Sequence, residues 1–139
     1  MLLEAFAVER AAVNITPDAE LKLRDLLRQM SAAADSFDLA AFHDADVEFH
    51  RQVWALAGNE YLSASLEGIA FRLFVLGCLN HGRDRLLASV EQHKGILEGL
   101  CSREPKKARA DFILHTLHFW DEADKVTPSP PAVYRSSGT

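Results

Sequence analysis

Features that mark several other classes of protein are missing from this sequence of 139 residues. Its two cysteines, Cys78 and Cys101, have no paired spacing, so we expect reduced thiols in a cytoplasmic protein and no disulfide framework. No apolar run approaches the roughly 18–20 residues that span a bilayer, and the N-terminus has no signal-peptide pattern. Positive charge is also scarce, since 15 Lys+Arg stand against 20 Asp+Glu. The resulting net charge of -5 argues against direct DNA binding by these residues.

Patterns typical of β-strands and of phosphate-binding loops are absent as well. No segment of useful length alternates between apolar and polar residues, and no glycine-rich loop occurs. The length fits one domain with a real core, and the hydrophobic fraction of 48% and the charged fraction of 25% are ordinary for a globular protein. We therefore predict an all-α fold.

Helical periodicity and capping residues divide the chain into about six helices joined by short loops. Thr16 and Pro17 mark one helix start, Asp38 can cap the next helix, and Gly58-Asn59 can end that helix in a left-handed conformation. The fifth helix starts either at Ser89, which has capping-box spacing to Gln92, or earlier, near Arg85. We expect an antiparallel bundle over 1–126, with a truncated first helix, and a flexible Pro- and Ser-rich tail over 127–139.

Polar side chains interrupt the apolar stripes of three of these helices. Asp46 lies inside one stripe, and His50 lies on its border four residues later, so the two side chains project from the same face. His93 and His115 each lie within the apolar stripe of a later helix. Burying such groups costs on the order of several kcal/mol unless a partner satisfies them.

Two interpretations of these polar groups remain open from the pattern alone. A single histidine on an apolar face is most often a core residue that hydrogen-bonds a backbone carbonyl. A buried divalent metal would instead satisfy all four groups at once, because one Asp and three His suit a borderline ion.

Arg72, in the most apolar half of its helix, either extends to the surface or reaches into a cavity to bind an anion.

Two stretches resemble signatures of the C-terminal effector-binding domain (FCD domain) of FadR-branch GntR transcription regulators. The first stretch is Asp46-x-x-Phe49-His50 followed by Ala57-Gly58-Asn59-x-x-Leu62. The second is Glu91-Gln92-His93-x-x-Ile96-Leu97 through Ala108-x-x-x-Phe112-x-x-His115, with a fitting separation between its two histidines. The resemblance covers about residues 3–125.

The resemblance implies a bundle with a central cavity, in which Asp46, His50, His93 and His115 hold a divalent metal. Zinc is the first expectation, with nickel, manganese or iron as alternatives. A small carboxylate or related metabolite would bind there as the effector, and Arg72 would pair with it. The resemblance also implies a homodimer that reaches DNA only through an N-terminal winged helix-turn-helix domain, to which nothing in these residues corresponds.

Three functions follow as hypotheses. The favoured one is a non-enzymatic ligand sensor that works by population shift. The second is a metal-dependent enzyme that uses the same Asp/His centre, although we find no general base beyond the ligands, since Glu48 should point away. The third is a helical dimerisation module whose histidines are structural. The sequence identifies neither the effector nor the metal.

Overall fold

The computed structural model describes residues 2–78 and 82–126, and all six of the elements in these ranges are α-helices. The prediction of an all-α bundle is therefore confirmed. The helices are α1 Leu2–Asn14, α2 Pro17–Asp35, α3 Leu39–Leu56, α4 Glu60–Cys78, α5 Arg83–Cys101 and α6 Pro105–Val126. The predicted tail over 127–139 lies outside the described residues, so the domain boundary at residue 126 stays a prediction.

Capping interactions fix the start of the helix that carries the Asp46 motif. The backbone N–H of Ala41 donates to the Asp38 carboxylate at 3.0 Å, as expected for an N-cap residue. Gly58 ends the segment with a φ of +71°, a conformation that glycine adopts without steric cost. Asn59 has a different role from the predicted one, because its side-chain oxygen accepts from Leu62 N–H at 3.1 Å and so caps α4.

Helix α5 begins at Arg83, earlier than either predicted start. Gly82 is its N-cap residue in an extended conformation. Ser89 consequently lies inside the helix and is buried, so it does not serve as a cap. This register places the backbone carbonyl of Ser89 one turn before His93, where it contacts the imidazole.

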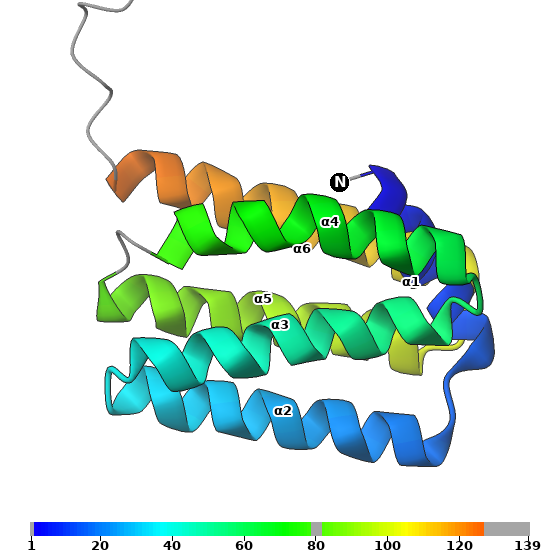
Figure 1. The fold of residues 1–139 in the computed structure, drawn as a ribbon, viewed down its shortest axis with the longest axis horizontal. Helices are drawn as coiled ribbons and strands as arrows, with labels where there is room; N and C mark the ends of the chain where they lie inside the picture. The colour runs from blue at the N-terminus through cyan, green and yellow to red at the C-terminus, as the bar shows by residue number, and fades with distance from the viewer. Residues whose placement is uncertain (1, 79–81, 127–139) are drawn as a thin grey trace, which may run out of the picture.

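Helices α2 to α6 run along the long axis of the bundle (Figure 1). Helix α1 packs against α3, α4, α5 and α6, and helix α2 packs against α3 and α5. Since α1 and α2 both contact α3 and α5, helices α3 and α5 lie on opposite sides of the centre of the bundle. Side chains that extend from α3 and α5 can meet in this space.

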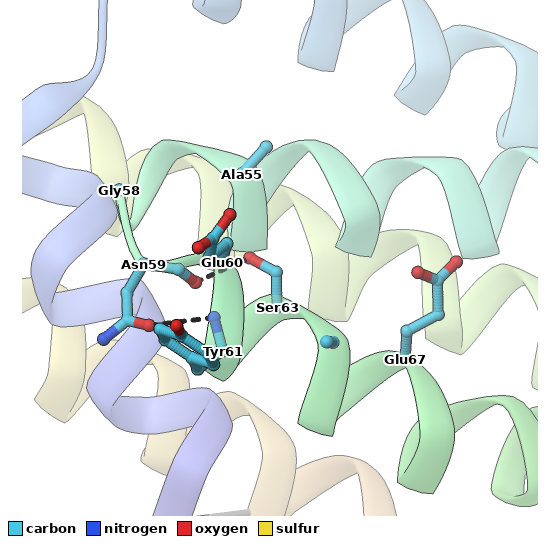
Figure 2. Close-up of a pocket in the computed structure, with 8 residues that line it drawn as sticks. Ala55, Gly58, Asn59, Glu60, Tyr61, Ser63 and Glu67 are labelled. Atoms are coloured by element: carbon cyan, nitrogen blue, oxygen red, sulfur yellow. Dashed lines mark hydrogen bonds between the residues drawn. The ribbon is translucent and has the colours of Figure 1, made fainter.

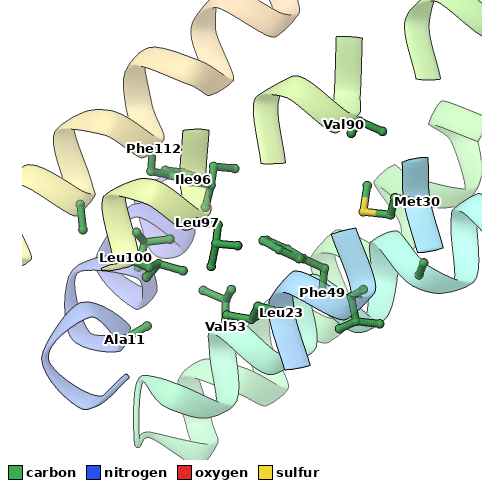
Figure 3. Packing of buried hydrophobic residues seen from close by; sticks show 14 of the residues in the cluster. Ala11, Leu23, Met30, Phe49, Val53, Val90, Ile96, Leu97, Leu100 and Phe112 are labelled. Carbon is green, nitrogen blue, oxygen red and sulfur yellow. The ribbon is translucent and has the colours of Figure 1, made fainter. Parts of the chain in front are cut away.

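The centre of the bundle is filled by one large apolar cluster, with a smaller cluster beside it. Phe49 is fully buried in the large cluster, where its ring lies near Leu23, Val53 and Leu97 (Figure 3). Trp54, one turn beyond His50, belongs to the smaller cluster with Ala7, Ala57, Leu62 and Leu66. Within the described residues, no helix combines the length and the apolar character needed to cross a membrane.

Candidate metal centre

Three of the four predicted ligands come together between α3 and α5. The nearest atoms are Oδ1 of Asp46 and the Nε2 atoms of His50 and His93. The His93 nitrogen is 2.8 Å from the Asp46 oxygen and 3.1 Å from the His50 nitrogen. The His50 nitrogen is 3.4 Å from the Asp46 oxygen. Asp46, His50 and His93 thus form a group that could hold a metal ion.

The backbone determines which nitrogen of His93 can bind a cation. His93 Nδ1 lies 2.6 Å from the Ser89 carbonyl oxygen, which can only accept, so Nδ1 carries the hydrogen and donates it. In the neutral ring Nε2 then has a free lone pair, and this lone pair faces the Asp46 carboxylate. Two acceptors at 2.8 Å repel each other unless a proton or a metal cation lies between them.

Burial makes this arrangement more demanding. Asp46 is 8% exposed and His93 is 2% exposed. Asp46 Oδ1 accepts no well-formed hydrogen bond from any side chain or backbone group in the described part of the chain. The rings of Phe49 and His93 form a T-shaped contact with centroids 5.0 Å apart. The ring centroids of Trp54 and His50 are 5.9 Å apart. The apolar surroundings strengthen every charge interaction inside the group.

The electrostatic balance keeps the Asp46 carboxylate ionised. Burial alone would raise the pKa of this carboxyl group, but the charges of His93 and His50 and their close approach to the carboxylate hold it well below its ordinary value. Burial likewise favours neutral His50, whereas the nearby Asp46 carboxylate and the charge of Glu4 raise the pKa of His50 above its ordinary value. A metal ion at this point would therefore replace a proton that the group attracts.

The donor set fits a borderline divalent metal in its chemistry and in its spacing. One carboxylate and two imidazoles are ligands suited to zinc and to its first-row neighbours. Metal–ligand bonds of about 2.0–2.1 Å place ligand atoms about 3.3 Å apart in a tetrahedral site and about 3.0 Å apart in an octahedral site. The observed separations of 2.8, 3.1 and 3.4 Å surround these values. Three protein donors leave at least one coordination position open.

His115 does not join this group of ligand atoms. It comes from α6 and is half-buried, and its ring lies directly over Gly95 of α5. A Cβ atom added to Gly95 would lie 2.3 Å from His115 Nε2, so the close approach depends on glycine. His115 stays a predicted fourth ligand, and it would have to turn away from Gly95 to reach the other three donors.

Arg72, the predicted effector-binding residue, lies on α4, but its side chain is outside what the structure describes. The sequence interpretation gave no site role to two further charged residues. Arg85 lies eight residues before His93 on the same face of α5 and is half-buried, a spacing that the sequence could have revealed. Glu4, on α1, lies 3.7 Å from His50 Nδ1. Helical periodicity could not reveal Glu4, because it does not say which helices are neighbours.

A pocket at the corner between α3 and α4 is a separate feature (Figure 2). None of the four predicted ligands lines it; its lining residues are Ala55, Gly58, Asn59, Glu60, Tyr61, Ser63, Ala64 and Glu67. The polar groups there serve the helix turn, since Asn59 caps α4 and the Ser63 hydroxyl lies 3.1 Å from the Trp54 carbonyl oxygen and donates to it. The pocket is therefore not a candidate for the metal centre.

The contact between Gly95 and His115 leads to a testable contrast between two helical glycines. Gly68→Ala should raise the free energy of unfolding by about 1 kcal/mol, because alanine favours a helix and nothing lies within 4 Å of the new Cβ atom. Gly95→Ala should lower it, because three atoms of the His115 ring lie within 2.5 Å of the new Cβ atom and must leave. Urea unfolding of the metal-free protein measures both changes. An equal rise in both variants would contradict the packing of His115 on α5.

The comparisons with known proteins point to one family. The FCD domain family matches residues 1–116 of the chain. The matched range contains Asp46, His50, His93 and His115, and it covers α1 to α5 and the first half of α6. No curated protein shows a significant match. Because the family match extends over far more than half of the sequence, this protein belongs to the FCD domain family.

Proposed function

We propose that this chain is the ligand-sensing domain of a GntR-type transcription regulator and binds a small carboxylate at a buried divalent metal. Asp46, His50 and His93 would hold the metal, with His115 as a fourth ligand. Zinc suits this donor set best, and nickel, manganese or iron could replace it. The observation that carries the proposal is the meeting of one carboxylate oxygen and two imidazole nitrogens in an apolar core, at separations that suit the ligands of one cation.

The residues of the chain have distinct parts in this proposal. The Ser89 carbonyl fixes the tautomer of His93, and the Asp46 carboxylate supplies the negative charge that holds a cation. A bound divalent metal supplies an open coordination position for an oxygen of an anionic ligand. Because the ligands come from α3 and α5, an effector that favours one arrangement of these helices would shift the population toward it. DNA contact would come from a separate winged helix-turn-helix domain, in keeping with the acidic balance of this chain.

A sensor is favoured over an enzyme by the family and by the surroundings of Glu48. FCD domains are regulatory, effector-binding domains. Glu48, the carboxylate next to the motif, accepts a hydrogen bond from Gln52 at 2.5 Å and lies 3.8 Å from Lys22 of α2. These partners engage Glu48 away from the metal ligands, so it is not available there as a general base.

Metal binding is the first test of the proposal. The chelator-treated wild type should take up one Zn²⁺ per chain and unfold at a higher temperature with zinc present, since a ligand at 100 times its Kd adds about 2.7 kcal/mol. His93→Ala and Asp46→Ala should lose both effects, because each removes a donor of the group. His43→Ala is the matched control, since His43 is a half-buried histidine of α3 outside the group. The measurements are metal analysis and thermal unfolding.

Two results would contradict the metal proposal. One is a wild type that takes up no stoichiometric divalent metal, and the other is a His93→Ala variant with unchanged uptake and stability. Either result would favour the structural module. His115→Ala decides the fourth ligand separately: weaker zinc binding supports His115 as a ligand, and unchanged binding removes it from the set.

Effector binding is the second test. Calorimetric titration of the zinc-loaded protein with small carboxylates should show saturable binding without formation of product. Arg72→Ala should weaken this binding about 10- to 100-fold, as expected for loss of a charge-assisted hydrogen bond of about 1.5–3 kcal/mol, and should leave the zinc content unchanged. Arg51→Ala is the control, because Arg51 is an exposed arginine paired with Glu67. Turnover of a carboxylate that disappears in Asp46→Ala would instead establish the enzyme.

A homodimer also stays part of the proposal. Large apolar side chains are exposed on the neighbouring helices α1 and α6, where a partner subunit could cover them. They are Leu2, Leu3, Phe6, Val13, Leu114 and Leu117. Sedimentation equilibrium measures the assembly directly, and the mass of a single chain at micromolar concentration would contradict the dimer.

A further inference from the structure

The environment of Glu4 suggests a second function for α1 beyond packing. The Glu4 side chain is 22% exposed and lies in the first turn of α1, with its Oε1 atom 3.7 Å from His50 Nδ1. The His50 side chain is 12% exposed. Its other nitrogen, Nε2, faces Asp46 and His93. The imidazole therefore lies between a carboxylate of α1 on one edge and the ligand group on the other.

This placement matters because a histidine binds a metal through one nitrogen while the other carries hydrogen. For Nε2 of His50 to present a lone pair, Nδ1 must carry the hydrogen and needs an acceptor. For His93 the backbone carbonyl of Ser89 is that acceptor. For His50 the Glu4 carboxylate occupies the corresponding place. At 3.7 Å the contact is longer than a hydrogen bond, and a small rotation of the Glu4 side chain would close it.

We propose that Glu4 is a positioning residue for His50, which fixes the ring for metal binding and links the metal centre to α1. This inference rests on the metal-binding function proposed above. Outer carboxylates of this kind orient metal-bound histidines and make the ring a stronger ligand. The charges also balance, since the carboxylates of Glu4 and Asp46 together carry the charge that a divalent cation neutralises.

The other acidic side chain on the same helix is engaged elsewhere and offers a matched comparison. Glu9 of α1 forms an ion pair with Arg109 of α6 at 2.9 Å, and its side chain is 27% exposed, close to the value for Glu4. Both residues are partly buried glutamates of α1, but among the described residues Glu4 lies near a ligand histidine, whereas Glu9 pairs with Arg109. A change at Glu9 should therefore disturb α1 without affecting His50.

The link to α1 has a consequence for signalling. Helix α1 contacts α3, α4, α5 and α6, so it is the helix best placed to register a change at the centre of the bundle. Metal binding that fixes His50 would also fix Glu4 and order the first turn of α1. Hydrogen exchange of the backbone amides in residues 4–8 should accordingly slow when Zn²⁺ is added.

The experiment measures the Kd of Zn²⁺ by competition with a chromophoric chelator, using the full chain. Glu4→Ala should weaken binding 10- to 100-fold, and Glu4→Gln less, because its amide oxygen can still accept from Nδ1–H. Glu9→Gln should bind zinc within twofold of the wild type. In a His50→Ala background, Glu4→Ala should have no further effect, which separates an action through His50 from a general loss of folding. Circular dichroism of the metal-free variants checks that each is folded.

The outcomes separate this inference from the function on which it rests. If the wild type binds zinc and folded Glu4→Ala binds it equally well, Glu4 is not a positioning residue and the metal proposal stands. Equal weakening by Glu4→Ala with and without His50 would also overturn the inference. If the wild type binds no divalent metal, both proposals fail together. Slower hydrogen exchange in the first turn of α1 that persists in Glu4→Ala would refute the link to α1.

Discussion

The meeting of a carboxylate oxygen and two imidazole nitrogens in an apolar core is the constraint on which the centre of this structure depends. Asp46 Oδ1 and the Nε2 atoms of His50 and His93 face the same small space, with separations of 2.8 to 3.4 Å. In water such groups would turn apart and hydrogen-bond to solvent. In the bundle, burial among Phe49 and Trp54 removes that alternative, so neighbouring acceptor atoms need a hydrogen or a metal cation between them. A proton can meet this need for one pair of atoms, and a divalent metal can meet it for all three.

The diagonal placement of α3 and α5 explains why this arrangement is possible. Two helices in direct contact would fill the space between them with their own apolar side chains, as α2 and α3 do. Helices on opposite sides of a centre, here with α1 and α2 between them, leave room for polar side chains to meet. Imidazoles from both sides and one carboxylate meet there. The apolar clusters around Phe49 and Trp54 then keep the helices at this separation.

Local sequence signals predicted the helices well, and they predicted the candidate site in part. Caps such as Asp38 and Gly58 are decided by neighbouring residues, so their positions could be predicted. Periodicity placed Asp46 and His93 on inward faces but carried no information about distances between helices. The position of His115 depends on how closely α6 approaches Gly95. This distance between helices cannot be predicted from the apolar stripe of one helix. Glu4 was missed for the same reason, because its contact with His50 joins helices far apart in sequence.

Charge limits what a sensor built on this centre could bind. Two carboxylates and neutral imidazoles around a divalent cation leave no excess positive charge, so an anionic effector would enter a neutral, apolar region at a considerable cost. A further cation must accompany it. The candidates are Arg72 of α4 and Arg85 of α5, the latter two helical turns from His93. Effector binding at the proposed centre would therefore involve α4 or α5 as well as the metal ligands. The proposed contact of Glu4 with His50 would link the same centre to α1. A small anion could in this way change the relation between helices that do not pack directly against each other.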